Sequence, residues 1–579
     1  MHLSWIDYGV LALLLSFSMV IGIYQGCFLS KQLTTNEFLI ADGRMKILPT
    51  AMSLLASLMS AAALLGIPLE IYSYGTMYVY WIFAYFIGTY LTVNLFIPMF
   101  RQIGNLSIYA YLEQRFSITV RIVITICYIL VTIFYIAVIL YGPSLALSQV
   151  TGLHIWLAVL SCGIICTIYT SIGGMKAVIW TDVIQTILMF LGVILSVGFG
   201  FYDAGGVTNV VRSAMEGNRI QLSTITWDPS IRYTVWSIII GGGLNATAVY
   251  ACLQTQAQRY LCVKSTRAAQ KVAWVNFIMC AFMLFLSTSV GLLLYTKYNQ
   301  CDPLRAKLIS KPDQLYPLFI IETLGRFPGL TGLFVASILS ASLSTVSSGI
   351  NSITTVVLED IYKSIYKESL MSDEKQATVS KLLSVLIGLL VIFIAIATSF
   401  FGNNIIVIVF QISGSFAAPI LGVFLVGFFV PRVNSRSILV AFTCCLLFQT
   451  WVLIGATLTV KPQIGKGGRL PTSVEGCLSS LNSNQTIRTN QSSNFFLPLY
   501  SISVMWYSFN AVVIIVVISL LGTLIFGSND PKTIDQSLLL SWKKIFSCCW
   551  KHKKSVSLKA DEINAIPIKA VEQELILLN

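Results

Sequence analysis

A series of apolar segments, each long enough to cross a lipid bilayer, constrains this chain more than any other feature. A transmembrane helix needs about 20 predominantly apolar residues, and this sequence is 56% hydrophobic and only 11% charged. The pattern predicts an all-α polytopic membrane protein with about thirteen transmembrane helices. They are expected near residues 5–27, 47–70, 76–100, 118–148, 154–171, 177–201, 233–254, 270–296, 329–357, 378–400, 404–428, 437–459 and 503–527.

The basic residues lie in loops and recur on one side of the predicted membrane. Short loops that contain Lys or Arg alternate with short loops that contain none, so the positive-inside rule makes the basic loops and the tail cytoplasmic. An odd number of spans then places the N-terminus outside, in a plasma-membrane protein whose C-terminus is cytoplasmic. The charge of +13 therefore belongs to membrane loops and does not indicate nucleic acid as a partner. These basic residues are Lys31, Arg44, Lys46, Arg101, Arg115, Lys176, Arg259, Lys264, Arg267, Lys543, Lys544, Lys551, Lys553 and Lys554.

The loop 460–502 is expected outside. It contains two Asn-x-Ser/Thr sequons, at Asn484 and Asn490, which are glycosylated only on that side. Of thirteen cysteines, only Cys301 and Cys477 fall in long outer loops, which makes them disulfide candidates; the alternative is two unpaired thiols. The first span has no Lys or Arg before it and a long apolar core, so a retained helix rather than a signal peptide is expected.

Two spans look unsuited to being continuous helices. The second is rich in Ser and Ala over 53–63 and continues to Gly66 and Pro68, while the seventh contains Gly241, Gly242 and Gly243. Because these spans are five apart, they predict a 5+5 inverted repeat whose broken helices meet at the membrane midplane. The alternative is that the small residues only allow close helix packing.

Ionisable residues inside spans are functional candidates by default. Asp182 and Gln185 lie three residues apart, on one side of their predicted helix. They could form a cytoplasmic gate or an ion exit path; equally, Asp182 could be a helix-start acid satisfied by the helix dipole and a basic loop. Glu70, at the outer end of its span, is expected to reach water and to be structural.

The predicted span 329–357 carries seven hydroxyl residues within positions 337–348. Sodium, like calcium, is a hard cation that needs several oxygen ligands, and hydroxyls facing an unwound helix would supply them. Ala341, Ser344 and Thr345 share one helical face. The pattern favours a cation site over hydroxyls that merely bond back to their own helix. No catalytic motif, metal-ligand spacing or phosphate-binding loop is present, so we expect neither an enzyme nor a cofactor other than sodium as coupling ion.

Several motifs resemble the sodium/solute symporters, in the branch of iodide, monocarboxylate and multivitamin transporters. The longest is QVTGLHIWLAVLSCGIICTIYTSIGGMKAVIWTDVIQ (149–185), and others are LGIPLEIYSYG (65–75), QTQAQRYL (254–261), LSASLSTVSSGINS (339–352), LED (358–360) and APILGVFLVGFFVP (418–431). The resemblance implies a LeuT-type core. It also implies a sodium site at Ala56, Met59, Ala341, Ser344 and Thr345, an ion pathway through Asp182 and Gln185, and a substrate pocket near Ser57, Ser60, Ala63, Asn245, Gln411 and Ser413.

The sequence departs from this branch at two positions. Ala63 stands where iodide-moving relatives have a glutamine, which argues against iodide and against a second sodium beside the pocket. Ser73 stands where the branch often has an arginine, which removes a charge near the outer vestibule. We therefore expect sodium-coupled symport of a small anion, a monocarboxylate or a carboxylated vitamin such as biotin or pantothenate. A sodium-gated sensor or an uncoupled ion pathway on the same fold is the alternative.

The expected organisation follows from the spans. Residues 1–46 are the first helix and a cytoplasmic loop, 47–201 the first repeat, 202–232 an extracellular loop, and 233–428 the second repeat. Residues 429–527 hold the last two helices and the outer loop, and 528–579 the cytoplasmic tail. Membrane lipid is an expected partner, and the oligomeric state stays open.

Overall fold

The computed structural model describes residues 4–24, 34–363, 372–398, 405–459, 468–477 and 495–540. These residues form helices joined by loops, with no β-strand among them. Asn484 and Asn490 lie outside the described residues.

The α-helices are α1 (Trp5–Ile23), α2 (Thr35–Ile40), α3 (Ile47–Leu58), α4 (Ala61–Tyr74), α5 (Trp81–Leu91), α6 (Ile97–Ile103), α7 (Ala110–Arg115), α8 (Ile118–Thr151), α9 (Ile155–Asp203), α10 (Val207–Glu216), α11 (Gly243–Cys252), α12 (Gln254–Leu261), α13 (Thr266–Tyr298), α14 (Leu315–Leu324), α15 (Leu330–Val356), α17 (Asp373–Thr398), α18 (Ile405–Ile412), α19 (Ala418–Phe429), α20 (Ser435–Thr459), α21 (Leu497–Tyr500) and α22 (Tyr507–Phe526). Tighter or wider helical turns are η2 (Ala41–Gly43), η3 (Thr76–Tyr80), η4 (Thr92–Phe96), η5 (Ser237–Gly242), η6 (Pro312–Gln314), η7 (Val357–Tyr362), η8 (Ser413–Ala417), η9 (Val504–Trp506) and η10 (Gln536–Leu538).

The described residues contain the thirteen crossings that the sequence predicts. Ten helical segments are long and apolar enough to span a membrane, and two further spans are bent helix pairs, α3 with α4 and η5–α11 with α12. The thirteenth arises because α9 is two spans in one: its 49 residues would extend about 74 Å if straight, roughly twice what a bilayer needs.

The helix α9 turns back at Gly174, whose φ of 55° and ψ of −164° are not helical. A side chain there would meet the Phe38 carbonyl oxygen at 2.8 Å, so only glycine fits this corner. Both ends of α9 return to the face where α1 begins. There the Tyr8 hydroxyl, near the start of α1, donates to the carbonyl of Thr151, just before α9, and Asp203 forms an ion pair with Arg326.

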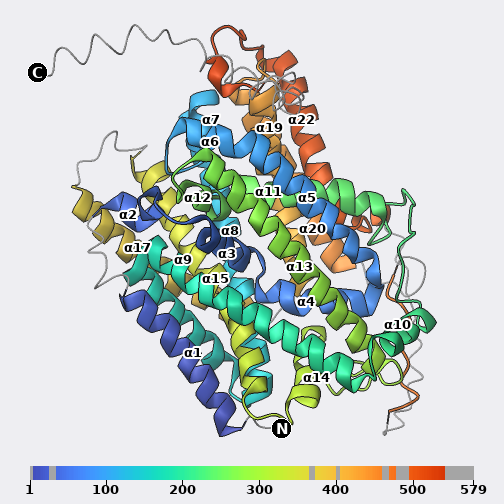
Figure 1. Cartoon of the computed structure of the whole chain (residues 1–579). Coiled ribbons are helices and arrows are strands. Elements are labelled where there is room, and N and C mark those ends of the chain that lie inside the picture. Colours follow the sequence, from blue (N-terminus) through green and yellow to red (C-terminus); the bar gives the residue numbers. More distant parts are fainter. Residues whose placement is uncertain are drawn as a thin grey trace, which may run out of the picture.

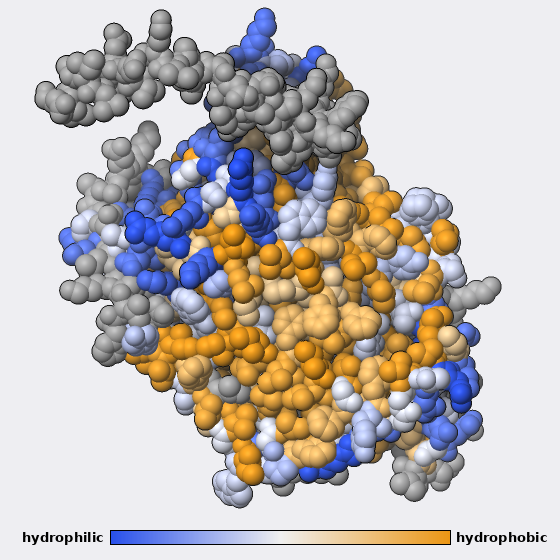
Figure 2. Space-filling model, viewed as in Figure 1, coloured by the Kyte–Doolittle hydropathy of each residue, from blue (hydrophilic) through white to orange (hydrophobic). Residues whose placement is uncertain are grey.

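The helix α15 lies at the centre of the molecule and packs against α9, α8, α1 and α3 (Figure 1). Almost all of its residues are buried, including its run of hydroxyl side chains. Figure 2 shows a broad hydrophobic surface between two more polar ends, as expected for a protein whose outer helices face lipid. The many hydroxyl side chains of α15 are tolerated in this setting because neighbouring helices shield them from the hydrocarbon.

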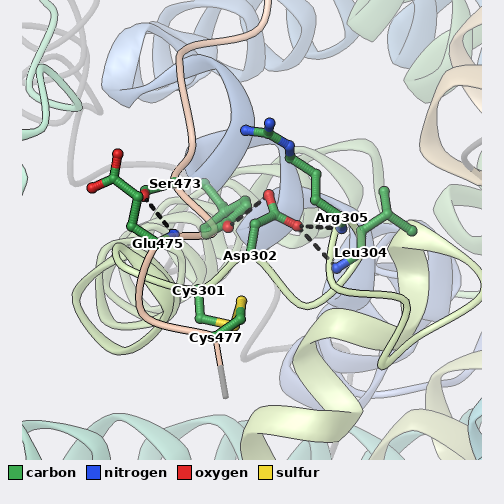
Figure 3. The surroundings of a disulfide bond; sticks show 8 residues. Cys301, Asp302, Leu304, Arg305, Ser473, Glu475 and Cys477 are labelled. Atoms are coloured by element: carbon green, nitrogen blue, oxygen red, sulfur yellow. Dashed lines mark hydrogen bonds between the residues drawn. A yellow bond between two sulfur atoms is a disulfide. The ribbon is translucent and has the colours of Figure 1, made fainter. Parts of the chain in front are cut away.

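Cys301 and Cys477 form the disulfide that the sequence predicts (Figure 3). Backbone hydrogen bonds flank the bridge, from Asp302 N to the Ser473 carbonyl (2.9 Å) and from Gly476 N to the Gln300 carbonyl (3.0 Å). The bridge therefore ties residues 468–477 to the loop after α13. We call the side of the molecule that carries this bridge and the start of α1 the disulfide face.

Candidate functional site

The second span breaks between α3 and α4, where the two helices meet at an angle of 60°. Met59 (φ −85°, ψ 70°) and Ser60 (φ −69°, ψ 170°) are non-helical, so the carbonyls of the last turn of α3 lose their usual helical amide partners. This break lies within the Ser- and Ala-rich stretch that the sequence singles out. Gly66 and Pro68 do not interrupt the span, since both are inside α4.

The seventh span also breaks, but not at its three glycines. Gly241 and Gly242 belong to the π-helical turn η5 and Gly243 begins α11, while the 55° bend falls at Leu253. The glycines serve close packing: a Cβ at Gly241 would lie 2.1 Å from the Met505 carbonyl oxygen. The expected break at the glycines is therefore wrong in position, because a π-turn keeps that backbone hydrogen-bonded.

A cavity of ≈ 130 Å³ lies between the two breaks. Five of the six predicted pocket residues line it: Ser57, Ser60, Ala63, Asn245 and Ser413. Gln411, two positions before η8, is half-buried and does not line it. No charged side chain belongs to the lining; its other polar groups include Thr132, Thr255 and Gln256, and its rings are Tyr78, Trp81, Tyr85, Tyr135, Tyr250 and Phe410.

Hydrogen bonds hold the polar lining in place. Asn245 Nδ2 donates to the hydroxyls of Ser413 (2.9 Å) and Ser508 (3.0 Å), which joins α11 to η8 and α22. Ser57 Oγ lies 3.0 Å from Gln256 Oε1, which joins the two broken spans. The cavity is thus built from elements of both predicted repeats.

Oxygen atoms gather beside this cavity where α15 meets the end of α3. Thr345 Oγ1 is 3.4 Å from each of the Ala56 and Ser57 carbonyls and 3.0 Å from the carbonyl of Ala341. The neighbouring Ser344 hydroxyl is buried without a hydrogen bond of good geometry, close to the Asp182 carboxylate. The structure therefore brings Ala56, Ala341, Ser344 and Thr345 together, with Met59 at the break next to them.

A buried ion pair lies toward the face opposite the disulfide face. Asp182 Oδ2 is 3.2 Å from Arg259 Nη2, and both side chains are fully buried. Ser53 Oγ donates to Asp182 (2.5 Å) and accepts from Arg259 Nε (2.8 Å). The second oxygen of Asp182 and both amide atoms of Gln185 have no hydrogen-bond partner among the described residues. These buried polar atoms are therefore available to bind an ion or water.

The sequence interpretation of Arg259 as a cytoplasmic loop residue is wrong. It belongs to α12, because the seventh span continues past its break to Leu261. Asp182 is correspondingly satisfied by an arginine of another helix rather than by a helix dipole and a basic loop. The alternation of polar residues in QTQAQRYL could have indicated a buried amphipathic half-helix, since a solvated loop needs no such pattern.

A second ion pair lies near the disulfide face. Glu70 is fully buried, against the expectation that it reaches water, and its carboxylate accepts from Arg232 (2.8 and 3.0 Å) and from the Tyr233 hydroxyl (2.7 Å). Burial alone would lower the pKa of the Arg232 guanidinium, but Glu70 and neighbouring phenols raise it above its ordinary value. Arg232 therefore stays protonated.

The model of the sodium:solute symporter family matches residues 38–444, well over half of the chain. The chain belongs to the sodium:solute symporter family. It is 37% identical over 566 residues to a sodium-dependent multivitamin transporter of Oryctolagus cuniculus, covering 94% of this chain and 88% of that protein. It is 35% identical to human sodium-coupled monocarboxylate transporter 1 (91% and 89% covered) and 36% identical to the human sodium/iodide cotransporter (82% and 73%).

Among solved structures, a sodium-coupled sialic acid symporter in a substrate-bound, outward-open state superposes with a TM-score of 0.73 at 22% identity, covering 91% of this chain and 99% of that chain. The likeness shows that this sodium:solute symporter has the predicted LeuT-type fold. Its family membership makes it a multi-pass membrane transporter and not an enzyme.

Proposed function

We propose that this protein imports a small organic anion together with sodium, by alternating access. The observation that carries the proposal is the uncharged cavity between two broken spans, next to the Thr345 hydroxyl oxygen, which lies 3.4 Å from the Ala56 carbonyl and 3.0 Å from the Ala341 carbonyl. Hard cations bind through such oxygens. We assign a sodium ion to the carbonyls of Ala56, Met59 and Ala341 and the hydroxyls of Ser344 and Thr345.

An anion can bind here without an arginine. The helices α4 and α12 both begin at the cavity, since Ser60, Ala62 and Ala63 line it on one side and Leu253, Thr255 and Gln256 on the other. The positive partial charge at helix N-termini favours a carboxylate. Sodium beside them would neutralise the rest of the charge, which couples binding of the two ions.

The substrate we propose is a monocarboxylate or a carboxylated vitamin, as the names of the relatives suggest. The six aromatic rings suit an apolar body, and Ser57, Ser60, Asn245 and Ser413 can accept or donate hydrogen bonds. Ala63 contributes only a methyl group to the lining, which supports a carboxylate over iodide and gives no ligand for a second sodium at that position.

Sodium would leave through Asp182 and Gln185. The Asp182 carboxylate lies near Ser344, and the Gln185 amide, three residues further along α9, has no hydrogen-bond partner among the described residues. Arg259 limits how strongly the Asp182 carboxylate can hold a cation. A weak intermediate site of this kind suits passage rather than storage.

The disulfide supports the proposed orientation in the plasma membrane, because such bonds persist in oxidising compartments. The disulfide face would be extracellular, with the N-terminus, and the opposite face cytoplasmic, with the C-terminus. In the same proposal, residues 47–201 and 233–428 form the two inverted repeats. Asn484 and Asn490 are glycosylated on the extracellular side.

The sodium stoichiometry sets how steeply substrate can accumulate. A tenfold sodium gradient supplies about 1.4 kcal/mol, and one charge crossing 70 mV about 1.6 kcal/mol. One sodium with one monovalent anion is electroneutral and uses only the first contribution. Two sodium ions would add the electrical contribution and carry current.

The test is uptake and current recorded together in expressing cells, with sodium replaced by choline as a control. We expect sodium-dependent accumulation of a monocarboxylate such as lactate, or of biotin, against its gradient. In the variants Ser344→Ala and Thr345→Ala, the sodium concentration for half-maximal uptake should rise roughly tenfold, because each loses a ligand worth about 1–2 kcal/mol. Ser289→Ala is the matched control, since this hydroxyl donates to the Phe285 carbonyl of its own helix.

Unchanged sodium dependence in both variants would overturn the sodium site. Sodium current without accumulation of any solute would instead favour the sensor or uncoupled pathway.

A further inference from the structure

A second cavity, of ≈ 250 Å³, lies on the disulfide face. Tyr74, Gln221, Thr224, Arg232, Tyr233 and Arg469 contribute its polar and aromatic lining. Its lining contains two arginines and no acidic side chain, whereas the lining of the central cavity contains no charged side chain at all. We call it the outer pocket.

The two arginines differ in charge balance. Arg232 is neutralised by Glu70, and its guanidinium lies 4.5 Å from the Tyr74 ring centre. Arg469 forms no ion pair within the described chain, and its buried Nε has no hydrogen-bond partner there. Among the described residues, the outer pocket therefore holds one positive charge without an ion-pair partner, and its buried Nε donor has no acceptor there.

The loop that carries Arg469 is anchored on three sides. Leu470 N donates to the Ser73 carbonyl (2.8 Å), and the buried Arg219 side chain donates to the carbonyls of Pro471 (2.9 Å) and Tyr72 (2.8 Å). The disulfide holds the other end of the segment (Figure 3). These contacts hold the backbone at Arg469 in place. They also bring it next to Ser73, the position at which this branch often has an arginine.

One pair of rings separates the outer pocket from the central cavity. Tyr233 lines the outer pocket and meets Tyr78, which lines the central cavity, edge to face at 5.5 Å. A ligand in the outer pocket would therefore be one aromatic layer away from the central cavity.

We propose that the outer pocket is a separate anion site, in which Arg469 binds a carboxylate while the Tyr74 and Tyr233 rings contact its apolar body. A guanidinium binds a carboxylate through two parallel hydrogen bonds, and the uncompensated charge attracts anions from solution. The site needs no sodium, because the oxygen cluster at Thr345 is elsewhere. It would concentrate anionic substrate at the entrance.

The test uses a cysteine in the pocket as a reporter. In intact cells expressing the full chain with Thr224→Cys, the labelling rates of two impermeant thiol reagents are compared in sodium-free choline medium. One is anionic, sulfonatoethyl methanethiosulfonate, and the other cationic, trimethylammonioethyl methanethiosulfonate. We expect the anionic-to-cationic rate ratio to fall roughly tenfold on adding Arg469→Gln. Benzoate should slow anionic labelling when Arg469 is present and have no effect when it is absent.

Arg305→Gln is the matched control, since Arg305 lies beside the same loop, bonded to the Thr472 carbonyl, but outside the pocket. It should leave both results unchanged. A rate ratio independent of Arg469, or benzoate protection that survives Arg469→Gln, overturns the proposal. Gln221→Cys provides a second reporter if Thr224→Cys does not reach the surface. Because the assay omits sodium, Thr345→Ala should not affect it, so failure of the outer site is distinguished from failure of sodium coupling.

Discussion

At the scale of single residues, the buried pair of Asp182 and Arg259 shows how this membrane protein stabilises charged side chains in its interior. Each guanidinium nitrogen of Arg259 donates to an oxygen from α3, α9, α12 or α15, through Ser53, Asp182, Thr255 and Ser348. One residue thus links four helices at the inner end of the proposed sodium path. Within the described part of the chain, one Asp182 oxygen still has no hydrogen-bond partner.

Removing one member of this pair should cost more than removing both. Asp182→Asn strands the buried Arg259 charge, and such changes cost about 3–5 kcal/mol. We expect a large loss of surface expression and a lower melting temperature for Asp182→Asn, measured by fluorescence-detected size exclusion after heating. Asp182→Asn combined with Arg259→Gln should recover much of that stability but not transport. A double variant less stable than the single one would contradict this account.

At the scale of elements, the sequence predicts the position of only one of the two helix breaks. The stretch 53–63 does contain the first break, since small and hydroxyl residues there leave the backbone free to unwind at Met59. The second break could not be placed, because Gly241–Gly243 are the stronger local signal while Leu253, where the helix bends, has no breaking tendency of its own. Tertiary packing decides that position. Arg259 is wrongly predicted to lie in a cytoplasmic loop because the sequence does not show that the span continues past Leu253 into α12.

The glycines of η5 provide a test of the packing interpretation. Gly241→Ala should be strongly destabilising, because its Cβ would lie 2.1 Å from the Met505 carbonyl oxygen and backbone must shift. Gly198→Ala, in α9, is the control: it meets nothing within 4 Å and should stabilise the helix by up to about 1 kcal/mol. Melting temperatures of the two purified variants decide the matter. Equal melting temperatures would mean that η5 does not need its close approach to η9.

At the scale of the whole molecule, thirteen crossings, the disulfide and the central hydroxyl-rich helix all follow from patterns that the sequence displays. Hydropathy finds spans because backbone polar groups cannot be left unpaired in lipid. Contacts between distant segments leave no such signal. The outer pocket depends on 468–471 lying against Ser73, and the burial of Glu70 depends on Arg232 reaching it from the loop before η5.

Alternating access requires the layer between the outer pocket and the central cavity to open. That layer consists of Tyr233 and Tyr78, and Trp81 of the central cavity stacks on Tyr78 (5.5 Å, 7°). Glu70 accepts hydrogen bonds from both Tyr233 and Arg232. Replacing the pair together, with Glu70→Gln and Arg232→Gln, avoids stranding a buried charge. It should weaken the layer and favour the outward-open state.

A reporter cysteine at Ala63→Cys, in the central cavity, measures that opening. We expect the extracellular trimethylammonioethyl reagent to label it several-fold faster in the paired Gln variant, since weakening by 1 kcal/mol changes an opening equilibrium about fivefold. Lys297→Gln with Glu322→Gln removes a more exposed ion pair (3.1 Å) on the same face but outside the layer, and should leave the rate unchanged. Equal rates in the two paired variants would mean that Glu70 and Arg232 support the fold without closing the cavity, and that the closing contact lies in the rings alone.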